Sequence, residues 1–171
     1  MNRMILRNFV RFVVLVSLQV FLLNKINFFG YLNPYIYILV IMLLPFETPG
    51  WLLLLFGFVT GLIIDMFSNT PGLNAAATVL LAFMRPAVIN LVGNRPDYEQ
   101  SGEPSMRDMG FQWFFPYAML LILIHHFALN IIDVFSFREI GQTFLRVIVS
   151  SAFTLIFILL AQYMLSVHKE R

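Results

Sequence analysis

Long apolar runs separated by short polar stretches are the main pattern along this chain. A helix needs about 20 apolar residues to cross ~30 Å of hydrocarbon, and six runs approach that length, although the second and third are short. We therefore predict an all-α polytopic membrane protein whose residues 1–171 form one transmembrane domain, a six-helix bundle. The predicted spans are 9–23, 31–45, 51–67, 73–92, 111–135 and 143–166. A re-entrant pair made by the second and third runs is the alternative.

Composition supports this class. The chain has 171 residues, of which 60% are hydrophobic and 12% charged, and its mean hydropathy is +0.83. A soluble domain of this length would carry about twice that share of charge. No basic stripe with interleaved aromatic residues is present, which argues against a nucleic-acid partner. The chain has no cysteine, which excludes disulfides and thiolate metal sites.

The distribution of Lys and Arg predicts the orientation. With the N-terminus in the cytoplasm, eight basic residues fall at or near the cytoplasmic face and three on the other, as the positive-inside rule requires. The eight are Arg3, Arg7, Arg11, Arg85, Arg95, Arg107, Lys169 and Arg171, and the three are Lys25, Arg138 and Arg146. No signal-peptide cleavage site follows Leu23, so the basic N-terminus and its apolar run are expected to form a retained first span.

The stretch 93–110, GNRPDYEQSGEPSMRDMG, is the only substantial polar segment. Its prolines, glycines and charges predict a flexible cytoplasmic loop, because it cannot bury enough apolar surface to fold on its own. A short docking segment for a cytosolic partner is the alternative interpretation.

Small residues predict close packing of the third and fourth spans. Gly57 and Gly61 lie along one side of the third helix with Asp65, in a small-xxx-small pattern that lets another helix approach. A matching strip on the fourth span consists of Ala75, Thr78 and Ala82.

Asp65 and Arg85 are the charges within this apolar region. By helix rise, Asp65 lies near the outer end of its span, whereas Arg85 lies ~18 Å below the outer end of the next one. We therefore expect no direct pair. Asp65 is expected to organise the following polar turn or to contact a partner, and Asn74 is a candidate N-terminal cap of the fourth span. For Arg85, snorkelling to the cytoplasmic interface is one interpretation, and a carboxylate contact within the protein or with a partner is the other.

Polar residues also mark one face of the fifth span. His126, Asn130 and Asp133 recur at helical spacing, and Arg146 begins the sixth span at the same outer end. We expect the histidine to make interhelical contacts and Asp133 to pair with Arg146. The spacing argues against a metal site, because it contains no Glu-x-x-His pattern and no cysteine.

Catalytic patterns are missing from the sequence. It has no nucleophile elbow, no glycine-rich phosphate loop and no paired central carboxylates, so we expect neither an enzyme nor a bound cofactor.

A family resemblance covers residues 32–86, about a third of the chain. Leu-Leu-Pro before the turn at 45–50, the G-x-x-x-G-L-I-x-D core, the polar turn and the Gly-Leu-x-Ala-Ala start of a span ending in Arg-Pro together resemble the rod shape-determining protein MreD family. Asn74 departs from the histidine expected there, which weakens any metal or proton role for this position.

The resemblance implies a bacterial inner-membrane scaffold with both termini cytoplasmic. Such proteins bind the single-span protein MreC and help couple MreB filaments to the peptidoglycan synthase complex of RodA and a penicillin-binding protein. The family fold is also similar to the substrate-binding subunits of energy-coupling-factor transporters. A small-molecule-binding transporter subunit is therefore the alternative function, with Asp65, His126, Asn130 and Asp133 as candidate pocket residues.

Overall fold

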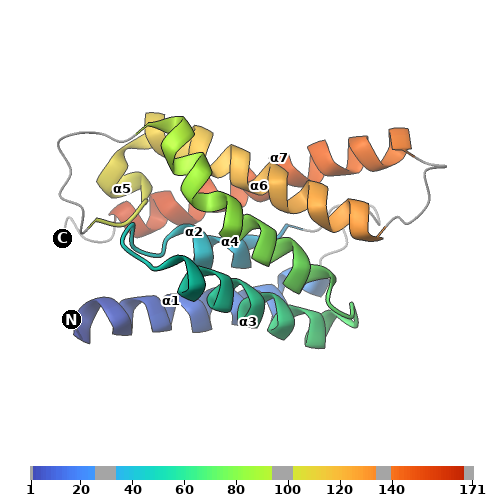
Figure 1. The fold of residues 1–171 in the computed structure, drawn as a ribbon, viewed down its shortest axis with the longest axis horizontal. Helices are drawn as coiled ribbons and strands as arrows, with labels where there is room; N and C mark the ends of the chain where they lie inside the picture. Colours follow the sequence, from blue (N-terminus) through green and yellow to red (C-terminus); the bar gives the residue numbers. More distant parts are fainter. Residues whose placement is uncertain (1, 26–33, 94–101, 134–139, 168–171) are drawn as a thin grey trace.

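The computed structural model describes residues 2–25, 34–93, 102–133 and 140–167, and every regular element in these ranges is helical (Figure 1). The two 3-10 turns are η1 (Leu23–Lys25) and η2 (Ile36–Ile38). The helices are α1 (Asn2–Phe21), α2 (Leu39–Met42), α3 (Gly50–Ser68), α4 (Leu73–Val92), α5 (Met106–Met109), α6 (Phe111–Asp133) and α7 (Ile140–Val167).

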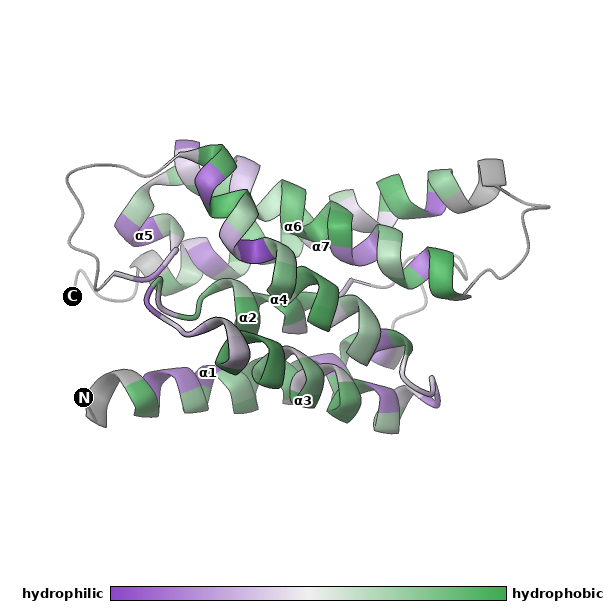
Figure 2. Cartoon of the chain, in the orientation of Figure 1, coloured by the Kyte–Doolittle hydropathy of each residue, from purple (hydrophilic) through white to green (hydrophobic). Residues whose placement is uncertain are grey.

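Four of the described helices are long and apolar enough to cross a membrane. They are Gly50–Ser68, Leu73–Val92, Phe111–Ile132 and Phe144–Leu165. Figure 2 shows these helices as largely hydrophobic, with hydrophilic positions at intervals inside the bundle. The prediction of a polytopic α-helical membrane protein is thereby supported in its coarser form, whereas six spanning helices are not found among the described residues.

The predicted span at 31–45 is where the structure differs most from the sequence prediction. Within its described part, only η2 and α2 are helical, and their seven residues extend roughly 12 Å instead of ~30 Å. Residues 36–44 are all buried, at 0–6% exposure. The run is apolar because protein surrounds it on every side, and hydropathy does not distinguish that environment from lipid. We call residues 34–46 the interrupted segment.

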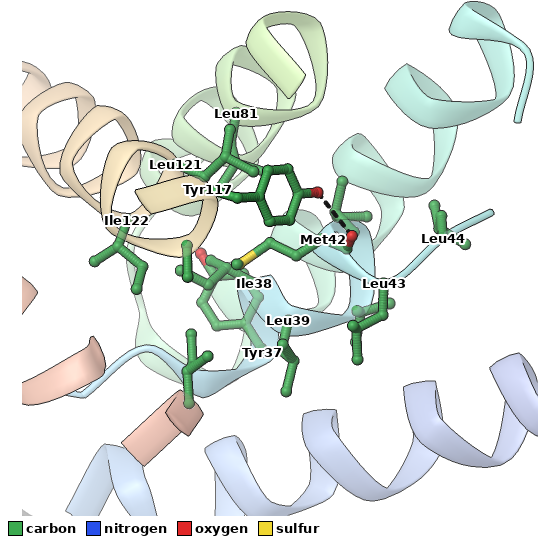
Figure 3. Close-up of a cluster of buried hydrophobic side chains, with 14 of the residues drawn as sticks. Tyr37, Ile38, Leu39, Met42, Leu43, Leu44, Leu81, Tyr117, Leu121 and Ile122 are labelled. Carbon is green, nitrogen blue, oxygen red and sulfur yellow. Dashed lines mark hydrogen bonds between the residues drawn. The ribbon is translucent and has the colours of Figure 1, made fainter. Parts of the chain in front are cut away.

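The interrupted segment lies at the centre of the bundle. It contacts α1, α3, α4 and α7 along its length, and the Tyr117 side chain of α6 reaches its backbone. Figure 3 shows its residues Tyr37 to Leu44 among side chains of α4 and α6. The first helix, α1, packs beside it, begins seven residues before the predicted first span and ends two residues earlier.

The two small-residue strips face each other where α3 packs on α4. A Cβ atom at Gly61 would lie 2.5 Å from the Ala75 Cα atom, and one at Gly57 would lie 3.1 Å from the Ala82 Cβ atom. At Gly61 the two backbones are therefore so close that no side chain fits between them. This contact places the start of α4 directly beside the end of α3.

The predicted flexible loop at 93–110 is ordered in its second half. Gly102 accepts a hydrogen bond from the Phe46 backbone N–H (3.3 Å), and the Glu103 side chain is buried. Ser105 caps α5 by accepting from the Asp108 N–H (3.1 Å). Contacts with distant residues, rather than local composition, hold this half in place, while 94–101 lies outside the described residues.

Candidate functional site

Several buried polar residues of the bundle contact the interrupted segment. A chain that is not helical at membrane depth must find partners for its backbone N–H and C=O groups within the protein. The 3-10 and α-helical turns of η2 and α2 satisfy some of these groups, and side chains from other helices bind groups at both ends.

Two side chains bind backbone groups at the N-terminal end of the segment. Gln19 of α1 accepts from the Ile36 N–H (2.9 Å) and donates to the Pro34 carbonyl (3.1 Å). Thr154 of α7 accepts from the Tyr35 N–H (3.1 Å). A glutamine can do both at once because its amide has a donor and an acceptor. The first and last helices thus hold the same short stretch.

Arg85 and Tyr117 bind backbone groups at the C-terminal end of the segment. Arg85 donates to the carbonyl oxygens of Leu44 and, at 3.5 Å, Pro45, and its Nε donates to the Tyr117 hydroxyl (3.1 Å). The hydroxyl in turn donates to the Met42 carbonyl (2.8 Å), as Figure 3 shows. These carbonyls lie where α2 ends, and a positive charge is favourable beside the carbonyl end of a helix.

The snorkelling interpretation of Arg85 is therefore wrong. Its side chain is among the largest that are fully buried, at 1% exposure, and it reaches carbonyls about 40 residues away in sequence. Among the described residues no carboxylate forms an ion pair with it, and the expected separation from Asp65 agrees with their different partners.

Asp65 caps the start of α4 from the end of α3. Its Oδ1 accepts from the Asn74 N–H (3.0 Å), the Asn74 side-chain amide (3.0 Å) and the Thr70 hydroxyl (2.7 Å), and its Oδ2 accepts from the Ala75 N–H (2.9 Å). Gly72, at the N-cap position, has no side chain to do this. A carboxylate at a helix N-terminus is also favoured by the helix dipole. Asp65, rather than Asn74, is thus the cap.

Tyr37 connects this cap to α6. Its buried hydroxyl lies 3.2 Å from Asn74 Oδ1, 3.1 Å from Thr78 Oγ1 and 2.8 Å from His125 Nε2. Thr78 also donates to the Asn74 carbonyl (2.7 Å). Side chains of α3, α4, the interrupted segment and α6 therefore form one connected network. Within the described part of the chain, Nδ1 of His125 has no hydrogen-bond partner.

His126 connects α6 to α7. Its Nδ1 lies 2.9 Å from the Ile122 carbonyl, which can only accept, so Nδ1 carries the proton. In the neutral ring, Nε2 then accepts from the Thr154 hydroxyl at 3.1 Å. The Asn130 side chain donates to the His126 carbonyl (2.8 Å), along its own helix. The interhelical contact expected for His126 is thus present.

The remaining candidate residues are placed only in part. Asp133 ends α6, but its side chain lies outside the described residues, so its pairing with Arg146 stays a prediction. Over the described ranges, no cluster of three or more histidine or acidic side chains is arranged to hold a metal ion.

Sequence reasoning missed Gln19, Tyr37, Tyr117, Thr154 and Glu103. Each is a polar side chain whose partner is distant in sequence, so no local motif marks it. Glu103 is one of four acidic residues in 93–110, and nothing in the sequence distinguishes it from the others. It is buried and paired with Arg7 (2.5 Å) and Arg11 (3.2 Å) of α1.

The fold and the network define a multi-pass α-helical membrane protein with a short, interrupted helical segment whose ends are hydrogen-bonded to buried polar side chains. No protein-family model, no curated protein and no solved structure matches this chain.

Proposed function

We propose that this protein is an integral scaffold of the bacterial cell-elongation machinery. It would bind an MreC-like single-span protein and, through the complex, help couple MreB filaments to peptidoglycan synthesis by RodA and a penicillin-binding protein. The proposal rests on the resemblance of residues 32–86 to the MreD family and on the way their polar residues are used.

One observation carries the scaffold assignment. Asp65, His126 and Asn130, the described candidates for a ligand pocket, are hydrogen-bonded to groups of the protein itself. Both carboxylate oxygens of Asp65 accept hydrogen bonds from the turn between α3 and α4 and from the start of α4, which gives that outer turn a defined shape. A surface of fixed shape is what a scaffold offers a partner, and we place the partner contact at residues 65–74.

The test is co-purification from the native bacterial membrane. The tagged full-length chain is extracted in mild detergent, and the proteins bound to it are identified by mass spectrometry. A single-span protein with a large extracytoplasmic region is expected, and its recovery should fall when the exposed Asn69 of the turn is changed to a bulky residue (Asn69→Trp). Recovery with no such partner would overturn the assignment.

The Lys/Arg asymmetry is the basis for the proposed orientation in the bacterial inner membrane. Both termini and residues 93–110 would lie in the cytoplasm. Because the chain lacks cysteine, Ser101→Cys and Ser136→Cys can be labelled singly in intact cells. A membrane-impermeant thiol reagent should label position 136 only. Labelling of position 101 from outside would reverse the topology.

A small-molecule-binding transporter subunit is the second candidate, favoured by the interrupted segment itself. Discontinuous helices near the bilayer midplane form the substrate sites of many secondary transporters. This reading expects a specific ligand in organic extracts of the purified protein and its loss from Asp65→Leu. If the protein is a scaffold, organic extracts of the wild-type protein and of Asp65→Leu should contain the same compounds.

A further inference from the structure

The α1 helix presents a basic residue at the end of an exposed apolar stripe. Val10, Val14 and Phe21 are 51–64% exposed and follow Arg7 at intervals of three, seven and fourteen residues. These spacings place all four on one side of the helix. The distance from Arg7 to Phe21 is 14 residues, ~21 Å of helix, which exceeds the ~15 Å depth of one bilayer leaflet.

The guanidinium of Arg7 is fixed but only partly used. Glu103, whose side chain is 4% exposed, receives hydrogen bonds from Arg7 (2.5 Å) and Arg11 (3.2 Å). Two positive charges therefore share one negative charge, and the trio keeps a net positive charge. Arg11 also donates to Asn8 (3.1 Å), whereas the Arg7 side chain is half exposed, with Glu103 as its single described acceptor.

The chemistry that complements this surface is an anion attached to a long apolar chain. A guanidinium binds phosphate through two parallel N–H groups, and the stripe beyond it suits hydrocarbon. We propose that the edge of α1 formed by Arg7, Val10, Val14 and Phe21 binds an anionic phospholipid, with the phosphate at Arg7 and one acyl chain along the stripe. This site is independent of the partner proposed above.

The test uses full-length protein in mild detergent with phosphatidylglycerol or phosphatidylcholine added. Bound lipid is counted by native mass spectrometry, and the thermal midpoint is measured in parallel. Wild type should retain phosphatidylglycerol preferentially, and Arg7→Gln should weaken that preference about fivefold. The matched control is Arg107→Gln, which removes an exposed charge in α5, outside the stripe.

Two further measurements distinguish the headgroup part of the site from its acyl-chain part. Glycerol 3-phosphate, which has the headgroup chemistry without acyl chains, should not raise the thermal midpoint. Val14→Gln leaves the Arg7–Glu103 pair in place and should also reduce retention, so it decides the question if Arg7→Gln fails to fold. Equal losses in Arg7→Gln and Arg107→Gln, or unchanged binding in Val14→Gln, would overturn the site.

Discussion

The α3–α4 hairpin and the interrupted segment are neighbours built by opposite means. In the hairpin, glycines bring two regular helices together until their backbones are in contact, and apart from the Asp65 cap of α4 their hydrogen bonds lie within each helix. In the interrupted segment, a short irregular chain depends on side chains from α1, α4, α6 and α7. The hairpin is therefore sensitive to added volume, whereas the segment is sensitive to lost polar groups.

The largest effect is expected from Arg85→Leu. It leaves the Leu44 carbonyl and the Tyr117 hydroxyl short of partners inside the bundle, at about 1–3 kcal/mol for each buried polar group. The yield of monodisperse protein in size-exclusion chromatography should drop severely. Arg107→Leu, an exposed position, is the control and should keep its yield. A well-folded Arg85→Leu would mean that the C-terminal end of the segment needs no cation.

Gly61→Leu comes next, because the side chain must enter a contact where a single Cβ would lie 2.5 Å from the Ala75 Cα atom. Overpacking of this kind costs typically 1–3 kcal/mol, and more where backbone must move. Thermal unfolding in detergent is the measurement, with Leu62→Phe as the neighbouring control on the exposed side of α3. If both variants melt alike, the glycine contact has been misassigned.

Asp65 belongs to both regions. It lies near the end of α3, its side chain caps α4, and through Asn74 it is connected to the Tyr37 network. Asp65→Asn should lose less stability than Asp65→Leu, because the amide oxygen still accepts one set of the α4 hydrogen bonds. We expect ~2 kcal/mol for leucine, measured by thermal unfolding. The same two variants, tested for partner recovery, should lose it in the same order while remaining inserted. If both variants lost the partner equally, the hydrogen bonds of the Asp65 carboxylate to the turn would not be what partner binding depends on.

Tyr37→Phe should have the smallest effect of the series. Only the hydroxyl is removed. Asn74 and Thr78 keep other hydrogen bonds, whereas the buried His125 ring loses its one described partner, so a loss of about 1.5 kcal/mol is expected. Hydrogen exchange at the start of α4 should rise modestly relative to α7. A loss as large as that of Arg85→Leu would show that the N-terminal end of the segment is the weaker of its two ends.

The same contrast explains which parts the sequence could predict. For α4 the predicted bounds, 73–92, are those observed, and α3 extends the predicted 51–67 by one residue at each end. Local patterns determine these helices. For 31–45 the sequence predicts a short span, with a re-entrant pair as the alternative, and the described residues form only two short helical turns. Pro34 and Pro45 enclose ten residues, and apolar runs of 10–14 residues are more typical of buried or re-entrant segments than of spans.

The site divides along similar lines. Helix rise correctly separated Asp65 from Arg85, because both depths follow from local counting. The carbonyls that Arg85 binds could not be foreseen, since they become available only where the segment stops being helical. Tyr37, Gln19 and Thr154 are likewise explained by that break and by nothing nearby in sequence.

The contact between Thr154 and the Tyr35 backbone has a consequence for biogenesis. Residue 35 leaves the ribosome long before residue 154, so the hydrogen bond from the Tyr35 N–H to the Thr154 hydroxyl forms only when the last helix is in place. Until then the interrupted segment lacks this contact with α7. A chain terminated before α7 should therefore be targeted and inserted but then degraded, because its interrupted segment lacks the contact with α7.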